Sequence, residues 1–179
     1  YKGRNSSIVI NDGTVLSMGR DSSSDNLKGV KLVVLIPRLE DVLGTIYVNT
    51  LSADISIKEI KTKVDIETRS TSGDVSLRSN NYKKADVNTT SGDIFIEESL
   101  FDRMRLKTSS GDITCEKTNS KVATCNSMSG DVDMCECEGD DVTLKSMSGD
   151  VLLSTIKYEE IDASTMSGDI SINNKAILE

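Results

Sequence analysis

Acidic side chains recur at fixed spacing in this chain and are the first candidates for chemistry. Each one ends a Ser-Gly-Asp tripeptide, and successive copies are 19 residues apart. The series consists of Asp74, Asp93, Asp112, Asp131, Asp150 and Asp169. Stacked carboxylates could bind calcium as a ladder, but calcium takes roughly six to eight oxygen ligands. The Gly-Gly-x-Gly-x-Asp pattern of calcium-binding solenoids is absent. We therefore favour the alternative that each carboxylate accepts backbone N–H groups at its own corner, and we predict no metal.

Cysteines form the second candidate group, because thiolates bind metals and form disulfides. Cys115, Cys125, Cys135 and Cys137 are spaced by ten, ten and two residues. This spacing matches no zinc knuckle or ribbon. Cys115 and Cys125 replace Ile, Leu or Val at positions expected to face inward, whereas Cys135 is expected to face outward and Cys137 to enter a turn. We favour free thiols, with a disulfide involving Cys137 or a four-thiolate metal site as alternatives.

Composition excludes several classes of function. The chain has 179 residues, a formal net charge of -8, no His and no Trp. Without His there is no Ser-His-Asp or Cys-His catalytic site, and we predict no catalytic residue and no cofactor. The acidic balance gives no electrostatic basis for a nucleic-acid partner. The longest apolar run, residues 32–36, is far shorter than the roughly 20 residues of a membrane span. Because the chain begins at Tyr1, we expect a trimmed piece, whose membrane anchor could lie upstream.

The 19-residue period predicts the fold. On both sides of each tripeptide, apolar residues alternate with polar ones, and Ser or Thr stands two positions before it. This alternation predicts two short strands that meet at a glycine corner, closed by a polar turn of about five residues. Such a unit buries its apolar face only by stacking on copies of itself. We predict an all-β, single-stranded right-handed parallel β-helix (β-solenoid) of about seven rungs. A sandwich or barrel of hairpins would need turn signals every ~8–12 residues.

The chain outside the regular repeats is expected to close the rod. Residues 1–45 are predicted as an N-terminal cap and first irregular rung, and residues 46–179 as one continuous solenoid. Within the cap, residues 7–10 and 14–17 flank Asn-Asp-Gly, which indicates a hairpin. Residues 30–36 are predicted as a strand that ends at Pro37.

Two further columns have side chains suited to binding. Met128, Met147 and Met166 each precede a tripeptide by one residue, and they are predicted to face outward as an adaptable apolar contact surface. The alternative is that the corner geometry tucks these side chains away. Tyr82, Phe101 and Tyr158 share one register in the predicted polar turn. We expect them to pack the turn onto the rod rather than to stack on sugars.

The repeats also resemble a known family. The evidence is the Ser-Gly-Asp series, the strand that runs into Pro37, and Thr-Thr-Ser-Gly-Asp-Ile-x-Ile at residues 89–96. Together they resemble the bacterial adhesin-type β-strand-repeat domain family, a domain family of unknown function, from about residue 30 to the end. The resemblance implies a right-handed β-helix, a bacterial origin and attachment to the cell envelope through an upstream membrane segment. It implies no catalytic residue. Ala53 and the cysteine-bearing stretch 115–137 depart from the repeat pattern.

These observations favour a non-enzymatic cell-envelope repeat module, an adhesin or surface-interaction scaffold. Its partner would be an envelope polymer, a protein or a second copy, and its expected location is the extracellular face, with a cytoplasmic location left open. The first alternative is an envelope-stress sensor or scaffold that acts by self-association. The second is a polysaccharide-acting β-helix enzyme, which would need long loops around a carboxylate cluster.

Overall fold

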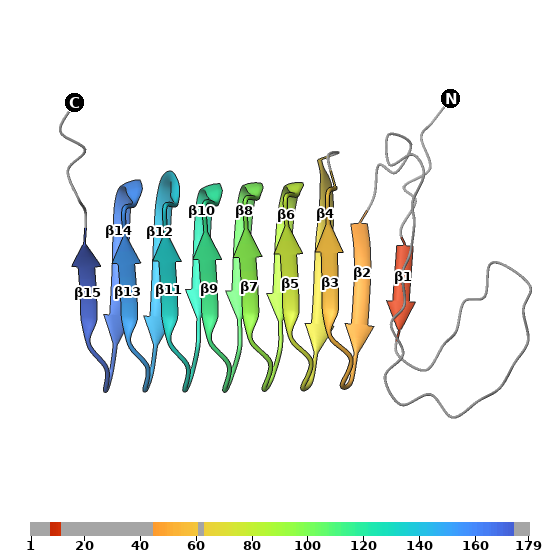
Figure 1. Cartoon of the computed structure of the whole chain (residues 1–179), viewed down its shortest axis with the longest axis horizontal. Helices are drawn as coiled ribbons and strands as arrows, with labels where there is room; N and C mark the ends of the chain where they lie inside the picture. The colour runs from red at the N-terminus through yellow and green to blue at the C-terminus, as the bar shows by residue number, and fades with distance from the viewer. Residues whose placement is uncertain (1–7, 12–44, 61–62, 174–179) are drawn as a thin grey trace, which may run out of the picture.

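The computed structural model describes residues 8–11, 45–60 and 63–173, and fifteen strands run through them (Figure 1). The strands are β1 (Ile8–Asn11), β2 (Thr45–Thr50), β3 (Ile55–Lys58), β4 (Val64–Ser70), β5 (Val75–Arg78), β6 (Asn81–Asn88), β7 (Ile94–Glu97), β8 (Leu100–Lys107), β9 (Ile113–Glu116), β10 (Asn119–Asn126), β11 (Val132–Cys135), β12 (Glu138–Ser146), β13 (Val151–Ser154), β14 (Lys157–Thr165) and β15 (Ile170–Asn173). Over these residues the chain has no helix that is long and apolar enough to cross a membrane.

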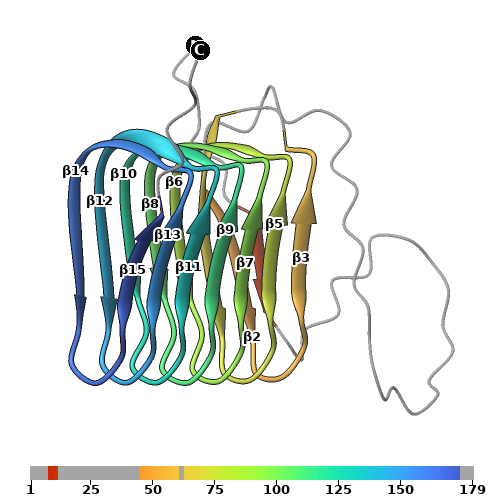
Figure 2. The same cartoon turned by 60° about the vertical axis from the view of Figure 1, so that its left-hand side comes forward.

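The strands form two parallel sheets that face each other (Figure 2). One sheet has eight strands in the order β1-β2-β4-β6-β8-β10-β12-β14, and the other has seven in the order β15-β13-β11-β9-β7-β5-β3. Every neighbouring pair is parallel, and residues such as Ile94 and Ile113 stand opposite each other one repeat apart. The predicted all-β fold, a β-solenoid of about seven turns with about 19 residues each, is therefore confirmed.

The apolar columns fill the space between the sheets, as the alternation predicts. Val75, Ile94, Ile113 and Val132, for example, are at most 1% exposed on four successive rungs. The burial is one-sided: in each four-residue strand from β5 to β11, buried positions alternate with half-exposed or exposed ones. Like residues therefore stack along the rod, and each rung is covered by the rungs on its two sides.

The predicted five-residue polar turn does not exist in that form. Its residues begin the longer strands, which start at Asn81, Leu100, Asn119 and Glu138. Each rung instead has a second tight corner, where one residue adopts a positive φ between 47° and 61°. These residues are Glu59, Ser79, Glu98, Lys117, Glu136 and Thr155. A rung is thus a short strand, a left-handed corner, a long strand and a Ser-Gly-Asp corner.

The described part of the predicted cap adds one strand to the rod. β1 pairs in parallel with β2, with Ile8 opposite Ile46, and is the terminal strand of the eight-stranded sheet. The predicted hairpin would have paired this segment with residues 14–17, which lie outside the described residues, as does the predicted strand 30–36.

The last described rung leaves its apolar side chains exposed. Ile161, Ile170 and Ile172 are 37%, 44% and 52% exposed, whereas their counterparts one rung earlier are buried. β14 and β15 are the terminal strands of their sheets, so no further described rung covers this end.

Candidate functional site

Buried hydroxyl groups join the Ser-Gly-Asp corners into a continuous seam, which is the lower row of corners in Figure 1. At each corner the Ser or Thr two positions before the tripeptide accepts a hydrogen bond from the glycine N–H. For Thr108 and Gly111 this distance is 3.0 Å. The same hydroxyl donates to the glycine carbonyl of the preceding rung, 3.1 Å from Thr108 to Gly92. The Ser and Thr hydroxyls that precede the tripeptides therefore link successive rungs of the rod.

Close stacking explains why glycine repeats at this corner. A Cβ built on Gly111 would meet the carbonyl oxygen of Gly92 well inside the 3.0 Å that real Cβ contacts keep. The glycines from Gly73 to Gly168 all show this clash with the preceding rung, and none has a positive φ. The close approach of neighbouring rungs, rather than a left-handed backbone, therefore requires glycine here. Ala53 fits this account, because β3 is the terminal strand of its sheet and has no earlier described corner beneath it.

The aspartates form a ladder along the same seam. One carboxylate oxygen of each aspartate from Asp54 to Asp150 accepts the backbone N–H of the aspartate on the next rung, over 2.7 to 3.0 Å. The bond joins different rungs, so the predicted capping of each aspartate at its own corner is corrected. Charge-assisted hydrogen bonds of this kind offset the repulsion between stacked carboxylates. In the described part of the chain, no group of three His, Cys, Asp or Glu side chains could hold a metal ion.

The methionine column lies on the outside of this corner. Met128, Met147 and Met166 are 49%, 45% and 78% exposed. They are in register, because the Ser148 N–H bonds to the Met128 carbonyl at 3.2 Å, and because Ser146 lies opposite Thr165. Leu51 occupies the same column four rungs before Met128 and is 69% exposed. An apolar strip on a rigid edge can contact a partner without rearrangement of the backbone.

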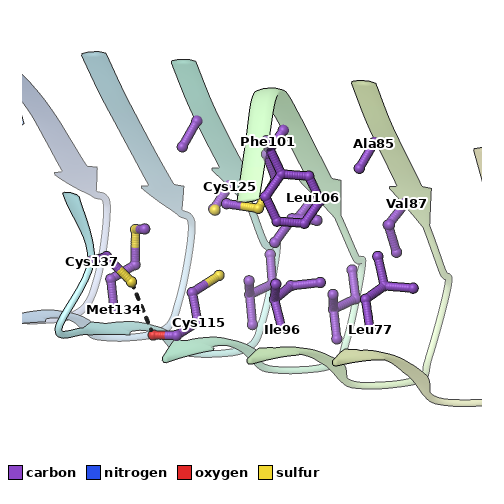
Figure 3. Packing of buried hydrophobic residues seen from close by; sticks show 14 of the residues in the cluster. Leu77, Ala85, Val87, Ile96, Phe101, Leu106, Cys115, Cys125, Met134 and Cys137 are labelled. Carbon is purple, nitrogen blue, oxygen red and sulfur yellow. Dashed lines mark hydrogen bonds between the residues drawn. The ribbon is translucent and has the colours of Figure 1, made fainter. Parts of the chain in front are cut away.

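The cysteines belong to the core rather than to a site. All four are free thiols; Cys115, Cys125 and Cys137 are buried and Cys135 is half-buried. In Figure 3 the three buried thiols lie among core side chains, and the Cys137 thiol donates to the Cys115 carbonyl at 3.5 Å. The neighbouring Cys125 thiol and burial raise the pKa of Cys115, while burial raises the pKa of Cys137 to about 12. The thiols of Cys115 and Cys137 are therefore protonated at neutral pH, which makes them poor nucleophiles.

The aromatic residues also pack inward, as expected. Tyr82 is fully buried and Phe101 is 5% exposed, and their rings stack with centroids 5.6 Å apart. This burial contradicts the alternative that these two rings stack on sugars. Tyr158 reaches across Gly139, so that its hydroxyl lies 3.0 Å from the Ser120 hydroxyl.

Sequence reasoning missed a hollow at the left-handed corner. A shallow cavity of about 430 Å³ lies beside Phe101, Ser120 and Gly139, where small residues interrupt the aromatic column. Gly139, which falls outside the Ser-Gly-Asp series, was the signal that could have revealed it. Among the charged groups around the hollow, Asp102 pairs with Lys63 at 3.3 Å and with Lys121 at 3.4 Å. These lysines lower the pKa of Asp102 and hold it as an anion.

Comparison with known proteins gives the chain its family. Neither a curated protein nor a solved structure matches it. A family model, described as Toastrack DUF4097, matches residues 4–177 and therefore nearly the whole chain. The match covers the described rungs and agrees with the predicted repeat domain of unknown function. The stacked parallel rungs belong to a member of the Toastrack DUF4097 family, an uncharacterised β-solenoid repeat domain.

Proposed function

We propose that this chain is a non-enzymatic module of the cell envelope that holds a contact surface on a rigid rod. The contact surface is the methionine column, Met128, Met147 and Met166. The observation that carries the proposal is the exposure of all three side chains, 49%, 45% and 78%, on consecutive rungs. Flexible, polarizable thioethers adapt to different apolar partners, and a flat strip of them suits a protein or polymer surface.

The rigidity of the corner supports this role. Each rung beneath the column is fixed by two hydroxyl hydrogen bonds and one aspartate hydrogen bond, such as those of Ser127, Gly130 and Asp131. A preorganised surface loses little conformational entropy when a partner binds. Within the described rungs, the short, uniform corners offer no loop that could enclose a substrate, which supports a binding role over a catalytic one.

Co-sedimentation with cell-wall and membrane fractions of the host tests this function. We expect the parent protein to sediment with one of these fractions and the triple variant Met128→Ser, Met147→Ser, Met166→Ser to stay in solution. The matched control is Leu100→Ser, which removes an apolar side chain that is 48% exposed at the opposite corner. This control is expected to sediment like the parent. Equal sedimentation of the parent and the triple variant would contradict the proposed surface.

Self-association is the second candidate function, and the exposed apolar side chains of the last described rung favour it. Ile161, Ile170 and Ile172 are partly exposed there, on the terminal strands β14 and β15. A second copy that stacks on this rung would bury the apolar side chains and pair with β14 and β15, the terminal strands among the described residues. Sedimentation velocity distinguishes the two candidates: Ile170→Lys with Ile172→Lys should abolish concentration-dependent association if the end is an interface. A parent that stays monomeric at all concentrations would exclude this candidate.

A further inference from the structure

Three of the six methionines in the chain occupy consecutive positions of one exposed column. The corresponding positions on the three preceding rungs are Thr71, Thr90 and Ser109. Apolar area alone could be supplied by Leu, Ile or Val, which are common elsewhere in the chain. What distinguishes methionine from them is its sulfur atom, a soft and polarizable ligand. We propose that the methionine column binds a soft monovalent metal ion, copper(I) or its analogue silver(I), through these thioether sulfurs.

The rung spacing allows two or three sulfurs to reach one ion. Neighbouring strands of a sheet lie ~4.8 Å apart, so Met128, Met147 and Met166 start from backbone positions separated by that step. The register is fixed on this corner by the Ser148 N–H to Met128 carbonyl bond of 3.2 Å. Each side chain has three rotatable bonds and can bring its sulfur toward that of its neighbour. Met147 has a methionine on both sides and therefore takes part in every neighbouring pair.

The chemistry of the corner selects a soft cation over a hard one. Thioethers favour copper(I), whereas calcium and magnesium require oxygen ligands. Asp131, Asp150 and Asp169 lie three residues beyond the methionines on the same corner and are exposed. One oxygen of Asp131 and one of Asp150 already accept a backbone N–H. The carboxylates therefore contribute negative potential that attracts a cation to the column.

Metal binding and partner contact would use the same three methionines but different properties of their side chains. Apolar contact depends on the surface of the methionine side chains, whereas metal binding depends on their sulfur atoms. Substitution by leucine keeps the apolar surface and removes the sulfur, and substitution by serine removes both. The triple leucine variant should therefore still co-sediment with the envelope fraction if the proposed function holds, whether or not it binds metal.

Silver(I) is the probe of choice, because it is a soft cation that undergoes no redox change with thioethers. The protein is labelled with ¹³C at the methionine methyl groups and titrated with silver nitrate, with Cys135→Ser as background. Cys135 is the one cysteine that is not buried in the described part of the chain. We expect the methyl signals of Met128, Met147 and Met166 to shift. Met104 and Met134 are fully buried and serve as internal controls that should not move.

Single leucine variants sharpen the test. Met147→Leu removes the sulfur common to both pairs and should weaken silver(I) binding by about tenfold or more. Met128→Leu leaves the pair of Met147 with Met166 and should have a smaller effect. Ser109→Met extends the column by one rung and should raise the binding capacity. A competition titration of copper(I) against bicinchoninate under anaerobic conditions is expected to give the same order.

Either of two results would overturn the inference. In the first, silver(I) leaves the three exposed methyl signals unmoved. In the second, the triple leucine variant binds silver(I) as tightly as the parent, which would place the ion elsewhere. The unfolding midpoint of each variant, measured in urea, verifies that the rod is intact before either result is read.

Discussion

Each rung turns two corners, and the two corners reach the same backbone reversal by different means. At the Ser-Gly-Asp corner the backbones of neighbouring rungs approach so closely that Gly111 has no room for a Cβ. At the opposite corner the rungs leave space for side chains, and the backbone turns through a residue with positive φ, such as Lys117 at 47°. Close approach demands one residue type, whereas a left-handed turn accepts several at a modest cost. This difference explains why only one of the two corners repeats visibly in the sequence.

A methyl group added at the crowded Ser-Gly-Asp corner should cause the largest loss in the free energy of unfolding. Gly111→Ala would press a Cβ against the carbonyl oxygen of Gly92, and neither backbone can move without displacing its rung. We expect a loss of about 3 kcal/mol or more in the free energy of unfolding. Urea denaturation followed by circular dichroism measures this loss. If Gly111→Ala were as stable as the parent, close stacking could not be the reason for the glycine.

The hydroxyl seam should account for the next largest effect. Thr108→Val keeps the shape of the side chain but leaves the buried Gly111 N–H without its acceptor and the Gly92 carbonyl without its donor. We expect a cost of about 1–3 kcal/mol, because buried polar groups lose hydrogen bonds and gain no water. Thr114→Val, at a half-exposed outward position of β9, is the control and should be nearly neutral. Equal stability of both variants would argue against the seam.

Alkaline pH should lower the free energy of unfolding, because the fold keeps the Cys137 thiol, beside the left-handed corner, in its neutral form. The pKa of Cys137 is about 12 in the folded chain against a reference value of 9.0, so the folded state favours the neutral thiol. Its contribution to stability is complete below pH 9 and is lost as pH rises from 9 toward 12. Between pH 8 and pH 10 the parent should lose about 1 kcal/mol more than Cys137→Thr, whose Thr118 counterpart one rung earlier shows that threonine fits. Parallel pH profiles of the two proteins would contradict this prediction.

The aspartate ladder should contribute less, because its carboxylates are exposed. Asp112→Ala removes the acceptor of the Asp131 N–H, a hydrogen bond of 2.8 Å, and should cost about 0.5–1 kcal/mol. Asp112→Asn keeps an oxygen acceptor and relieves like-charge repulsion, so its cost should be smaller. Thermal melts in calcium and in chelator check the role of the ladder in the same proteins. A melting temperature raised by calcium would restore the calcium ladder as a hypothesis.

A substitution at the left-handed corner should change the free energy of unfolding in the opposite direction. Lys117→Gly removes the penalty of about 1–2 kcal/mol that a non-glycine residue pays for positive φ. The added flexibility of glycine in the unfolded chain costs about 0.5–1 kcal/mol. The net result should lie between neutrality and a gain of about 1.5 kcal/mol in urea denaturation. A large loss of stability would mean that the lysine side chain itself holds the corner.

Much of the fold could be predicted from the sequence, because the stacking of rungs requires particular residue types at fixed positions. These are glycine where backbones approach closely, Ser or Thr where rungs are hydrogen-bonded, and apolar residues in the core. The left-handed corner could not be predicted, since Glu98, Lys117 and Thr155 have no residue type in common that signals positive φ. The alternation of inward and outward positions along each strand was enough to place the aspartates on the outside of the rod. Their partners could not be predicted, because the choice between an N–H on the same rung and one on the next depends on how the rungs stack. Burial of the aromatic register was expected, but the hollow beside Gly139 depends on side-chain volumes on several rungs at once.

The central claim is that the exposed methionine column contacts a partner. The hydrogen bonds of the Ser-Gly-Asp corner keep the rod rigid even without the methionine side chains. The most direct test of this claim is one protein measured in two ways: urea denaturation and envelope co-sedimentation of the triple variant Met128→Ser, Met147→Ser, Met166→Ser. The account predicts an unfolding midpoint close to that of the parent, because all three side chains are at least 45% exposed, together with loss of co-sedimentation. An intact rod that still co-sediments would contradict the claim.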